Sequence, residues 1–435
     1  MEFLATAIGL SRAILIFLLS RILGEALALI KLPSILGDLF AGIILGLSGL
    51  HLLVPPEAVE TLNSGLVEFM QSLSGGTPEQ IFAIYQKDIP SLETISELGL
   101  ICLLFVTGLE SDLQEMIRVG PQAATVATVG VIVPFALGTV GAIYLFDLPL
   151  SPALFAGAAL TATSIVITAK VLQDLGKLKS EEGKIIIGAS ILDDILGIVI
   201  LAVVVALVNT GNVEPSKIIL LVISAAVFIL SAVLLSKYFA PVFDALIDRL
   251  KVSGGLLVAS FIFLCFMCLF AATLQLETVL GAFAAGIVLG GTKREHEIIR
   301  QIQPIVTLFA TIFFVLIGTS IDLSLFNPLV PENREGLLFA VFLIVVAIFG
   351  KIVSGFTIFG KEQVDRLAIG AGMIPRGEVG LVFVGLGTAT GVLSNSVEAA
   401  LILMVIVTTF IAPLLLRVVF QASSKSQSQL QESKS

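Results

Sequence analysis

The sequence predicts an all-α membrane protein with thirteen transmembrane helices. Of its 435 residues, 57% are hydrophobic and only 13% are charged, and the mean hydropathy is +1.08. These values lie far from those of ordinary globular domains. The apolar residues are gathered in runs of about 20, which is the length that one helix needs to cross a bilayer.

Thirteen such runs follow one another, separated by polar connections or by connections that contain Gly and Pro. Their approximate limits are residues 3–30, 34–53, 95–117, 121–146, 153–173, 183–208, 217–237, 253–274, 277–291, 304–325, 335–359, 364–391 and 396–420. The longest polar interruption, 55–93, has room for a short interfacial helix. The polar tail, 421–435, is expected to be disordered.

The distribution of charge predicts the orientation of these helices. With the N-terminus outside and the C-terminus in the cytoplasm, the cytoplasmic connections and tail carry 17 Lys and Arg residues, whereas the opposite side carries three. Cytoplasmic loops of membrane proteins are enriched in Lys and Arg. We therefore expect this topology, in a prokaryotic-type inner membrane or an internal energy-coupling membrane. Four basic residues then lie in the interior of segments, away from their ends, namely Arg12, Arg21, Lys351 and Arg376.

The chain contains an internal repeat. LPSILGDLFAGIILG at 32–46 matches LETVLGAFAAGIVLG at 276–290 in 8 of 15 positions, and LLFVTGLESDL at 103–113 shares its Gly and Asp-Leu placement with FFVLIGTSIDL at 313–323. The matching helices are seven apart, so they run in opposite directions, as in the inverted-topology repeats of secondary transporters. Chance similarity of apolar, Gly-rich helices is the alternative. The GxxxG spacings in the first pair predict close helix packing.

Two adjacent acids, Asp193 and Asp194, lie in the middle of segment 183–208. Asp193 is about 15 Å along this helix, half the hydrocarbon thickness. A carboxylate at this depth is costly unless it faces a partner, a cavity or an ion, so the pair indicates a functional site. Neighbours on a helix are turned by about 100°, so each acid needs its own partner. Ser190 is four residues before Asp194 and on the same face, which makes it a further candidate ligand.

Lys351, in FGKIVSG, is the lysine that falls in the interior of a predicted membrane segment rather than near its end. A buried ammonium group requires an anion, and a buried aspartate is the partner that costs least for both groups. The pair either takes part in transport or is a purely structural bridge.

Segment 153–173 carries four hydroxyl side chains within TATSIVITAK. Thr161 and Thr168 are expected to bond back to their own helix. If the helix is broken here, Thr163 and Ser164 can offer neutral oxygen ligands to a small hard cation, beside freed backbone carbonyls.

The repeat partner of this segment contains GMIPRGEVGLV at 372–382. Pro375 and Gly377 flank Arg376 and predict an interruption of the helix, while Glu378 offers the arginine a counter-charge. Two broken helices that cross leave partial charges of both signs at their facing ends. We expect Arg376 and Glu378 to compensate these charges; direct ligation of the ion is the alternative.

These motifs together resemble the second family of monovalent cation/proton antiporters, especially its NapA-type Na⁺/H⁺ antiporters. The likeness lies in TATS at 161–164, SILDD at 190–194, the lysine in FGKIVSG and PRGEVGL at 375–381. The segments at 32–46 and 103–113 are similar to that family's second and third helices. K⁺-efflux members usually have a polar, non-acidic residue in place of the first aspartate, unlike this chain.

The resemblance implies a homodimer in the bilayer, with a NapA/NhaA-like fold in which two discontinuous helices cross. Each protomer would combine a dimerisation panel with a mobile core. Mapped onto this chain, the panel comprises 1–118 and 241–328, the core 119–210 and 329–420, and a linker helix 211–240.

The same likeness assigns roles to the site residues. Asp194 would be the carboxylate that holds the transported Na⁺, Asp193 would pair with Lys351, and Thr163 and Ser164 would lie at the crossing. We expect an electrogenic antiporter in which Na⁺ or Li⁺ and protons compete for the two aspartates and alternating access carries them across. A carboxylate binds a cation only when it is deprotonated, so protons displace the ion.

Several other functions are weighed against this one. A K⁺/H⁺ antiporter on the same scaffold, a passive cation channel and a non-transporting sensor are the alternatives. The sequence has no nucleophile with a base, metal cluster or phosphate loop, so we expect neither an enzyme nor a cofactor. Charges are spread over connections rather than gathered in a basic patch, so no nucleic-acid partner is expected.

Overall fold

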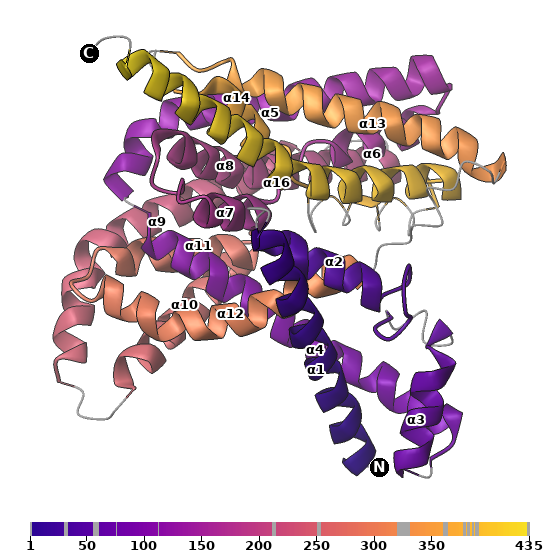
Figure 1. The fold of residues 1–435 in the computed structure, drawn as a ribbon. Helices are drawn as coiled ribbons and strands as arrows, with labels where there is room; N and C mark the ends of the chain where they lie inside the picture. The colour runs from indigo at the N-terminus through magenta and orange to yellow at the C-terminus, as the bar shows by residue number, and fades with distance from the viewer. Residues whose placement is uncertain are drawn as a thin grey trace. The chain divides into compact units, whose positions relative to one another are not determined.

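In the computed structural model, every element assigned in the described part of the chain is an α-helix (Figure 1). The structure describes residues 2–29, 34–54, 61–74, 76–111, 113–210, 215–249, 254–319, 331–359, 364–376, 380, 383–384, 387 and 391–432. This all-helical architecture confirms the predicted fold class.

Seven of the described helices are long and apolar enough to cross a bilayer. They lie within α4 (Pro78–Leu109), α5 (Leu113–Phe146), α9 (Pro215–Ile247), α10 (Gly255–Thr273), α12 (Glu295–Thr319), α13 (Pro331–Gly355) and α16 (Asn395–Glu432). Three shorter apolar helices are α2 (Ile35–Leu45), α6 (Leu150–Ala159) and α11 (Thr278–Gly290). The remaining helices are α1 (Glu2–Leu29), α3 (Ser64–Ser74), α7 (Ile165–Asp174), α8 (Glu181–Thr210) and α14 (Arg366–Gly372).

Two of the polar regions differ from expectation. The interruption at 55–93 holds α3 and also the first part of α4, which begins at Pro78 rather than near residue 95. The tail beyond residue 420, expected to be disordered, continues α16 to Glu432. Its Gln, Lys, Leu and Glu residues are good helix formers, so they extend a helix that is already nucleated.

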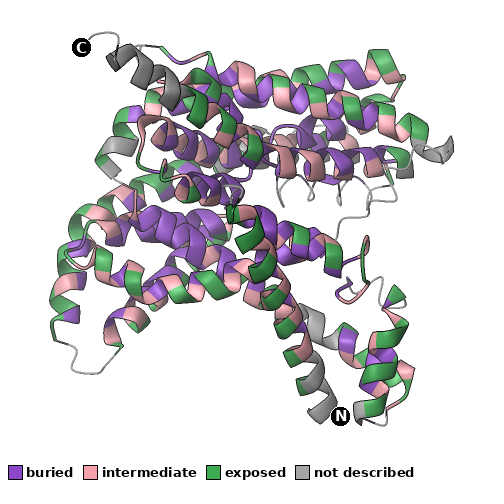
Figure 2. Ribbon diagram, viewed as in Figure 1, coloured by how far each residue is buried: buried purple, intermediate pink, exposed green. Residues whose placement is uncertain are grey.

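Many large apolar side chains are exposed on the helices, and Figure 2 shows in green where exposed residues lie along the ribbon. On α9, five large apolar residues at spacings of three and four are between 46% and 62% exposed, namely Leu220, Ile223, Val227, Leu230 and Leu234. This spacing places them on one side of the helix. An apolar stripe of this kind suits the acyl chains of a bilayer.

The chain divides into two compact units. One comprises residues 1–103 and 299–324, and the other comprises residues 104–298 and 325–435. The first contains α1 to α3 and most of α4 and α12. The second contains α5 to α11 and α13 to α16, with the remaining ends of α4 and α12. All the predicted site residues belong to the second unit.

In the first unit, Arg12 of α1 is buried against Tyr85 of α4. Nη2 of Arg12 donates to the carbonyl oxygen of Tyr85 at 3.1 Å, and the guanidinium carbon lies 3.5 Å from the centre of the tyrosine ring. The Tyr85 hydroxyl in turn donates to the carbonyl of Leu52 at 2.7 Å. Arg12 thus finds the acceptor and the aromatic face that a buried cation requires.

The sequence repeat corresponds to a repeated contact. Within the first unit, a Cβ on Gly42 of α2 would lie 2.6 Å from Cα of Gly318 in α12. Within the second unit, a Cβ on Gly286 of α11 would lie 2.7 Å from Cα of Gly108 in α4. Gly42 aligns with Gly286 in the repeat, and Gly108 aligns with Gly318. The predicted close packing at these glycines is confirmed, because any side chain would collide with the facing backbone.

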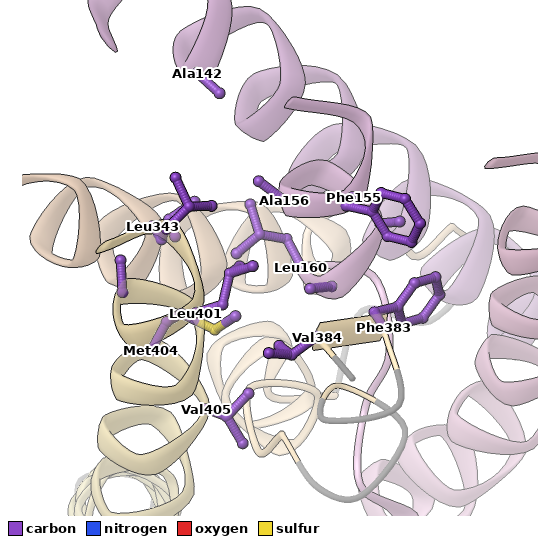
Figure 3. Packing of buried hydrophobic residues seen from close by; sticks show 14 of the residues in the cluster. Ala142, Phe155, Ala156, Leu160, Leu343, Phe383, Val384, Leu401, Met404 and Val405 are labelled. Atoms are coloured by element: carbon purple, nitrogen blue, oxygen red, sulfur yellow. The ribbon is translucent and has the colours of Figure 1, made fainter. Parts of the chain in front are cut away.

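A hydrophobic core in the second unit packs around α6 (Figure 3). It includes Phe155 and Leu160, Leu343 of α13, and Leu401 and Met404 of α16. Leu160 is the first residue after α6. The core therefore holds the point at which that helix ends.

Candidate functional site

The two predicted acids lie within α8, a long helix of the second unit. Asp193 is fully buried and Asp194 is 2% exposed. The helix packs against α5, α6, α7 and α14. Carboxylates with so little contact with solvent require polar or charged groups inside the protein.

The structure brings Lys351 of α13 to Asp193. Nζ of Lys351 lies 2.9 Å from Oδ1 and 3.1 Å from Oδ2 of Asp193, and both side chains are fully buried. Gly130 of α5 faces the lysine, and a Cβ there would lie 3.4 Å from Nζ. Gly130 thus leaves room for the ammonium group where α5 and α13 pack together.

The first helix interruption lies between α6 and α7. The chain leaves the helix after Ala159, and its last turn is closed by the Thr161 hydroxyl, which donates to the carbonyl of Ala158 at 2.7 Å. Ser164 then adopts an extended conformation as the residue before α7. Thr161 therefore bonds within its own helix, as predicted.

The second interruption follows α14, which ends at Gly372. Pro375 has no N–H with which to continue a helix. The freed carbonyls are instead bonded by the first interruption. Thr163 Oγ1 donates to the carbonyl of Met373 at 3.0 Å, and the main-chain N–H of Ser164 donates to that of Pro375 at 2.8 Å.

Thr168 contradicts the prediction made for it. Its hydroxyl donates to the carbonyl of Gly372 at 2.9 Å, not to its own helix. That carbonyl lies at the C-terminus of α14, where the helix no longer supplies N–H donors. A buried acceptor in a neighbouring chain segment has here displaced the local hydrogen bond.

Arg376 joins the two interruptions from the opposite direction. It is fully buried, and its Nη1 donates to the carbonyl of Ala162. The positive charges of Arg376 and Lys351 both act on Asp193. Glu378, the predicted counter-charge of Arg376, lies outside the described residues.

Two further hydroxyls lie near the two interruptions. Ser164 Oγ is buried and has no hydrogen-bond partner among the described residues. Ser190 Oγ lies 3.6 Å from the sulfur of Met373 and is fully buried. Both hydroxyls can therefore turn toward a ligand without breaking a strong hydrogen bond.

Sequence reasoning missed one contact with the second interruption. Thr409 of α16 is buried, and its hydroxyl donates to the carbonyl of Arg376 at 2.6 Å. In the sequence it is one of two adjacent threonines in an apolar helix, and nothing there distinguishes it from Thr408.

The second unit also contains a cavity of about 930 Å³. Five charged residues line it, namely Glu110, Lys179, Lys184, Lys237 and Glu295. Ile187 of α8 is among its other lining residues and precedes Asp194 by two helical turns. Residues at this spacing share one face of a helix, so the cavity lies on the Asp194 side of α8.

Glu110 directly follows α4, at the edge of this cavity. Burial raises the pKa of its carboxyl group, and the charge of Lys179 and a hydrogen bond with Gln173 act in the opposite direction. The negative charge of Glu295 reinforces the rise. The lining of the cavity therefore includes an acid that takes up protons more readily than a solvated glutamate.

Comparison with known proteins agrees with this arrangement. A family model described as "Sodium/hydrogen exchanger, transmembrane" matches residues 12–422. The high-affinity Na⁺/H⁺ antiporter NhaS3 of Synechocystis is 48% identical over 95% of this chain and 90% of its own length. The Na⁺/H⁺-K⁺ antiporter GerN of Bacillus cereus is 30% identical, over 95% of this chain and 96% of its own.

A solved structure shares the fold. The sodium proton antiporter MjNhaP1 of Methanocaldococcus jannaschii superimposes with a TM-score of 0.63 at 18% sequence identity, over 97% of each chain. The family match spans most of the membrane region, including both interrupted helices and the paired acids. This chain is therefore a multi-pass membrane protein that belongs to the transmembrane sodium/hydrogen exchanger family.

Proposed function

We propose that this protein is an electrogenic Na⁺/H⁺ antiporter that works by alternating access. Na⁺ or Li⁺ and protons compete for the site of Asp193 and Asp194. The observation that carries the proposal is the buried acid pair, with Lys351 bonded to one member, in the helix that packs against α7 and α14. The family match and the activity named for NhaS3 and GerN support it.

The site residues receive separate roles in this proposal. Asp194 holds the cation, because the other acid already accepts two hydrogen bonds from Lys351. Ser164, Ser190 and Thr163 supply neutral oxygens. Thr163 donates its hydrogen to Met373, which leaves the lone pairs of its oxygen available to a cation. Arg376 compensates the charges at the crossing, together with Glu378.

The Lys351 pair sets the stoichiometry. When Na⁺ binds at Asp194, the pair between Asp193 and Lys351 breaks and the lysine releases a second proton. Two protons then exchange for one Na⁺, and one net charge crosses in each cycle. At ~100 mV that charge is worth ~2.3 kcal/mol, which supports roughly a fifty-fold Na⁺ gradient at ~1.4 kcal/mol per decade.

The cavity lined by Lys179 supports a route for ions to the site. With the N-terminus outside and the C-terminus in the cytoplasm, this cavity opens to the cytoplasm of a prokaryotic-type cell. The protomer has thirteen transmembrane helices and an inverted repeat, forms a homodimer, and moves a core of residues 119–210 and 329–420 against its panel. The repeated glycine contact supports the repeat.

Ion exchange in proteoliposomes tests this function. Purified protein is reconstituted with a trapped pH-sensitive dye, a pH gradient is imposed, and Na⁺, Li⁺ or K⁺ is added with and without a membrane potential. We expect Na⁺ and Li⁺ to release protons, at a rate that changes with the potential. Indifference to the potential would contradict the stoichiometry, and flux uncoupled from protons would indicate a channel.

K⁺/H⁺ exchange is the second candidate, because GerN is named as a transporter of both ions. Hydroxyl and carboxylate ligands do not by themselves fix the size of the ion. In the same assay, proton release by K⁺ equal to that by Na⁺ would favour this candidate.

A further inference from the structure

Two adjacent threonines in the middle of α16 make different hydrogen bonds. The Thr408 hydroxyl stays within α16 and donates to the carbonyls of Met404 and Val405 at 2.8 and 3.0 Å. The Thr409 hydroxyl leaves the helix and donates to the carbonyl of Arg376 at 2.6 Å. Both side chains are buried. The two residues therefore differ in the acceptors of their hydroxyl groups, not in burial.

The carbonyl of Arg376 accepts a hydrogen bond from another helix. Residues 374 to 376 are outside any regular helix, and the Thr409 hydroxyl is the donor that the described residues give to this carbonyl. A buried carbonyl without a partner costs about 1 to 3 kcal/mol. α16 packs against α14 and so brings Thr409 to this carbonyl.

This hydrogen bond fixes the main chain of a residue whose side chain lies at the site. With its carbonyl on Thr409 and its Nη1 on Ala162, Arg376 is held at both ends. Its charge acts on Asp193, which also carries the bond from Lys351. A loss of the Thr409 bond would let the guanidinium drift away from the acids.

We propose that Thr409 is a positioning residue of the cation site, acting through Arg376. The inference rests on the proposed function and adds α16 to the elements that set cation affinity. Among the described residues, the charged groups that act on one another here are Arg376, Lys351 of α13, and Asp193 and Asp194 of α8. A guanidinium near a carboxylate favours its ionised form. Displacement of Arg376 would therefore make the aspartates bind protons more readily and Na⁺ less readily.

The test compares three substitutions in proteoliposomes. Thr409→Val keeps the shape but removes the hydroxyl, Thr409→Ser keeps the hydroxyl, and Thr408→Val is the matched control one residue away. We expect Thr409→Val to raise the apparent KM for Na⁺ about tenfold and to shift the pH of half-maximal exchange upward. The other two variants should resemble the wild type in both properties.

A second readout measures binding without transport. In detergent, Na⁺ that binds the folded protein raises its melting temperature. The Na⁺ concentration that gives half of this rise should increase about tenfold in Thr409→Val only. If the valine variant does not reach the membrane, Thr409→Cys replaces it, and the weaker donor should give a smaller rise in both readouts.

Three results would overturn the inference. Equal changes in Thr408→Val and Thr409→Val would indicate a general packing effect of α16. A folded Thr409→Val variant with wild-type KM and pH profile would show that the bond does not position Arg376. A wild type that exchanges no cation would overturn the proposed function as well, whereas an active wild type with an unaffected valine variant overturns the inference alone.

Discussion

The two interrupted helices that meet in the second unit differ in chemistry. The segment between α6 and α7, residues 160–164, is neutral and carries three hydroxyl side chains. The segment after α14, residues 373–376, offers Met, Ile, Pro and Arg and has one positive charge. Both segments are buried, and each supplies hydrogen-bond partners to the other.

This difference indicates a division of work between the two segments. A cation is attracted to hydroxyl and carbonyl oxygens and is repelled by a guanidinium, so the neutral segment faces the ion in our proposal. The charged segment offsets the two aspartates, which otherwise leave excess negative charge in a buried site. The four sets of substitutions below test this division, from the largest expected effect to the smallest.

Asp194→Asn should give the largest effect, because it removes the carboxylate that the neutral segment is proposed to serve. We expect Na⁺-driven proton movement in proteoliposomes to fall to the level of protein-free vesicles. Asparagine has nearly the shape of aspartate, so thermal unfolding should show a folded protein. Retained exchange would remove Asp194 from the site and leave the hydroxyls without an acid to assist.

Lys351→Ala should weaken exchange and make it less electrogenic without abolishing it. The substitution leaves Asp193 without its ammonium partner, and breaking a buried pair costs about 3 to 5 kcal/mol of stability. Combining it with Asp193→Asn removes the unpaired charge, so the double variant should recover part of the melting temperature. A voltage dependence equal to that of the wild type would contradict the proposed second proton.

Thr168→Val and Thr161→Val compare two hydrogen bonds. The Thr168 bond joins α7 to α14, whereas the Thr161 bond stays within the end of α6. Both threonines are fully buried. Loss of the Thr168 hydroxyl strands the carbonyl of Gly372 and should cost about 1 to 3 kcal/mol. The carbonyl of Ala158 keeps the N–H of Thr161 at 3.0 Å, so Thr161→Val should have a smaller effect. Equal losses of thermal stability would mean that the link between segments contributes nothing special.

Glu110→Gln should have the smallest effect on exchange and stability, since Glu110 lines the cavity and belongs to neither segment. Burial raises the pKa of Glu110, so ionising this carboxyl group lowers the stability of the folded protein. This loss of stability is absent at about pH 4, where the group is protonated, and develops as pH rises through the raised pKa. The variant should melt with the wild type at low pH and slightly above it at about pH 8. Glu79→Gln is the control, because the Thr77 hydroxyl lowers the pKa of Glu79. Its change in melting temperature at about pH 8 should have the opposite sign.

The fold could be predicted largely from the sequence. Runs of apolar residues placed the long helices, and Pro375 and Gly377 predicted the second interruption. The polar stretch at 55–93 could not be predicted in the same way. The first part of α4, which lies in this stretch, contacts α1 through the bond between Arg12 and Tyr85, and that bond joins residues 73 positions apart.

The sequence predicted the site residues whose burial costs much free energy, but not those whose burial costs little. Buried charges such as Lys351 and Asp193 stand out in an apolar chain, since each demands a partner. Threonine hydroxyls fit equally well inside a helix or across to a neighbour, so Thr168 and Thr409 gave no signal of their own. Their partners became evident only when the ends of α14 and the segment after it were placed in space.

The bonds between the two interrupted segments have a mechanical consequence. In the described residues, three hydrogen bonds join them, from Thr163 and Ser164 in one direction and from Arg376 in the other, and a fourth, from Thr168 to Gly372, joins α7 to α14. Bonded in this way, α7 and α14 respond to a displacement jointly, and the oxygens around the ion keep their spacing during the movement. We expect the order of preference among Li⁺, Na⁺ and K⁺ to be identical when measured from either face of the membrane.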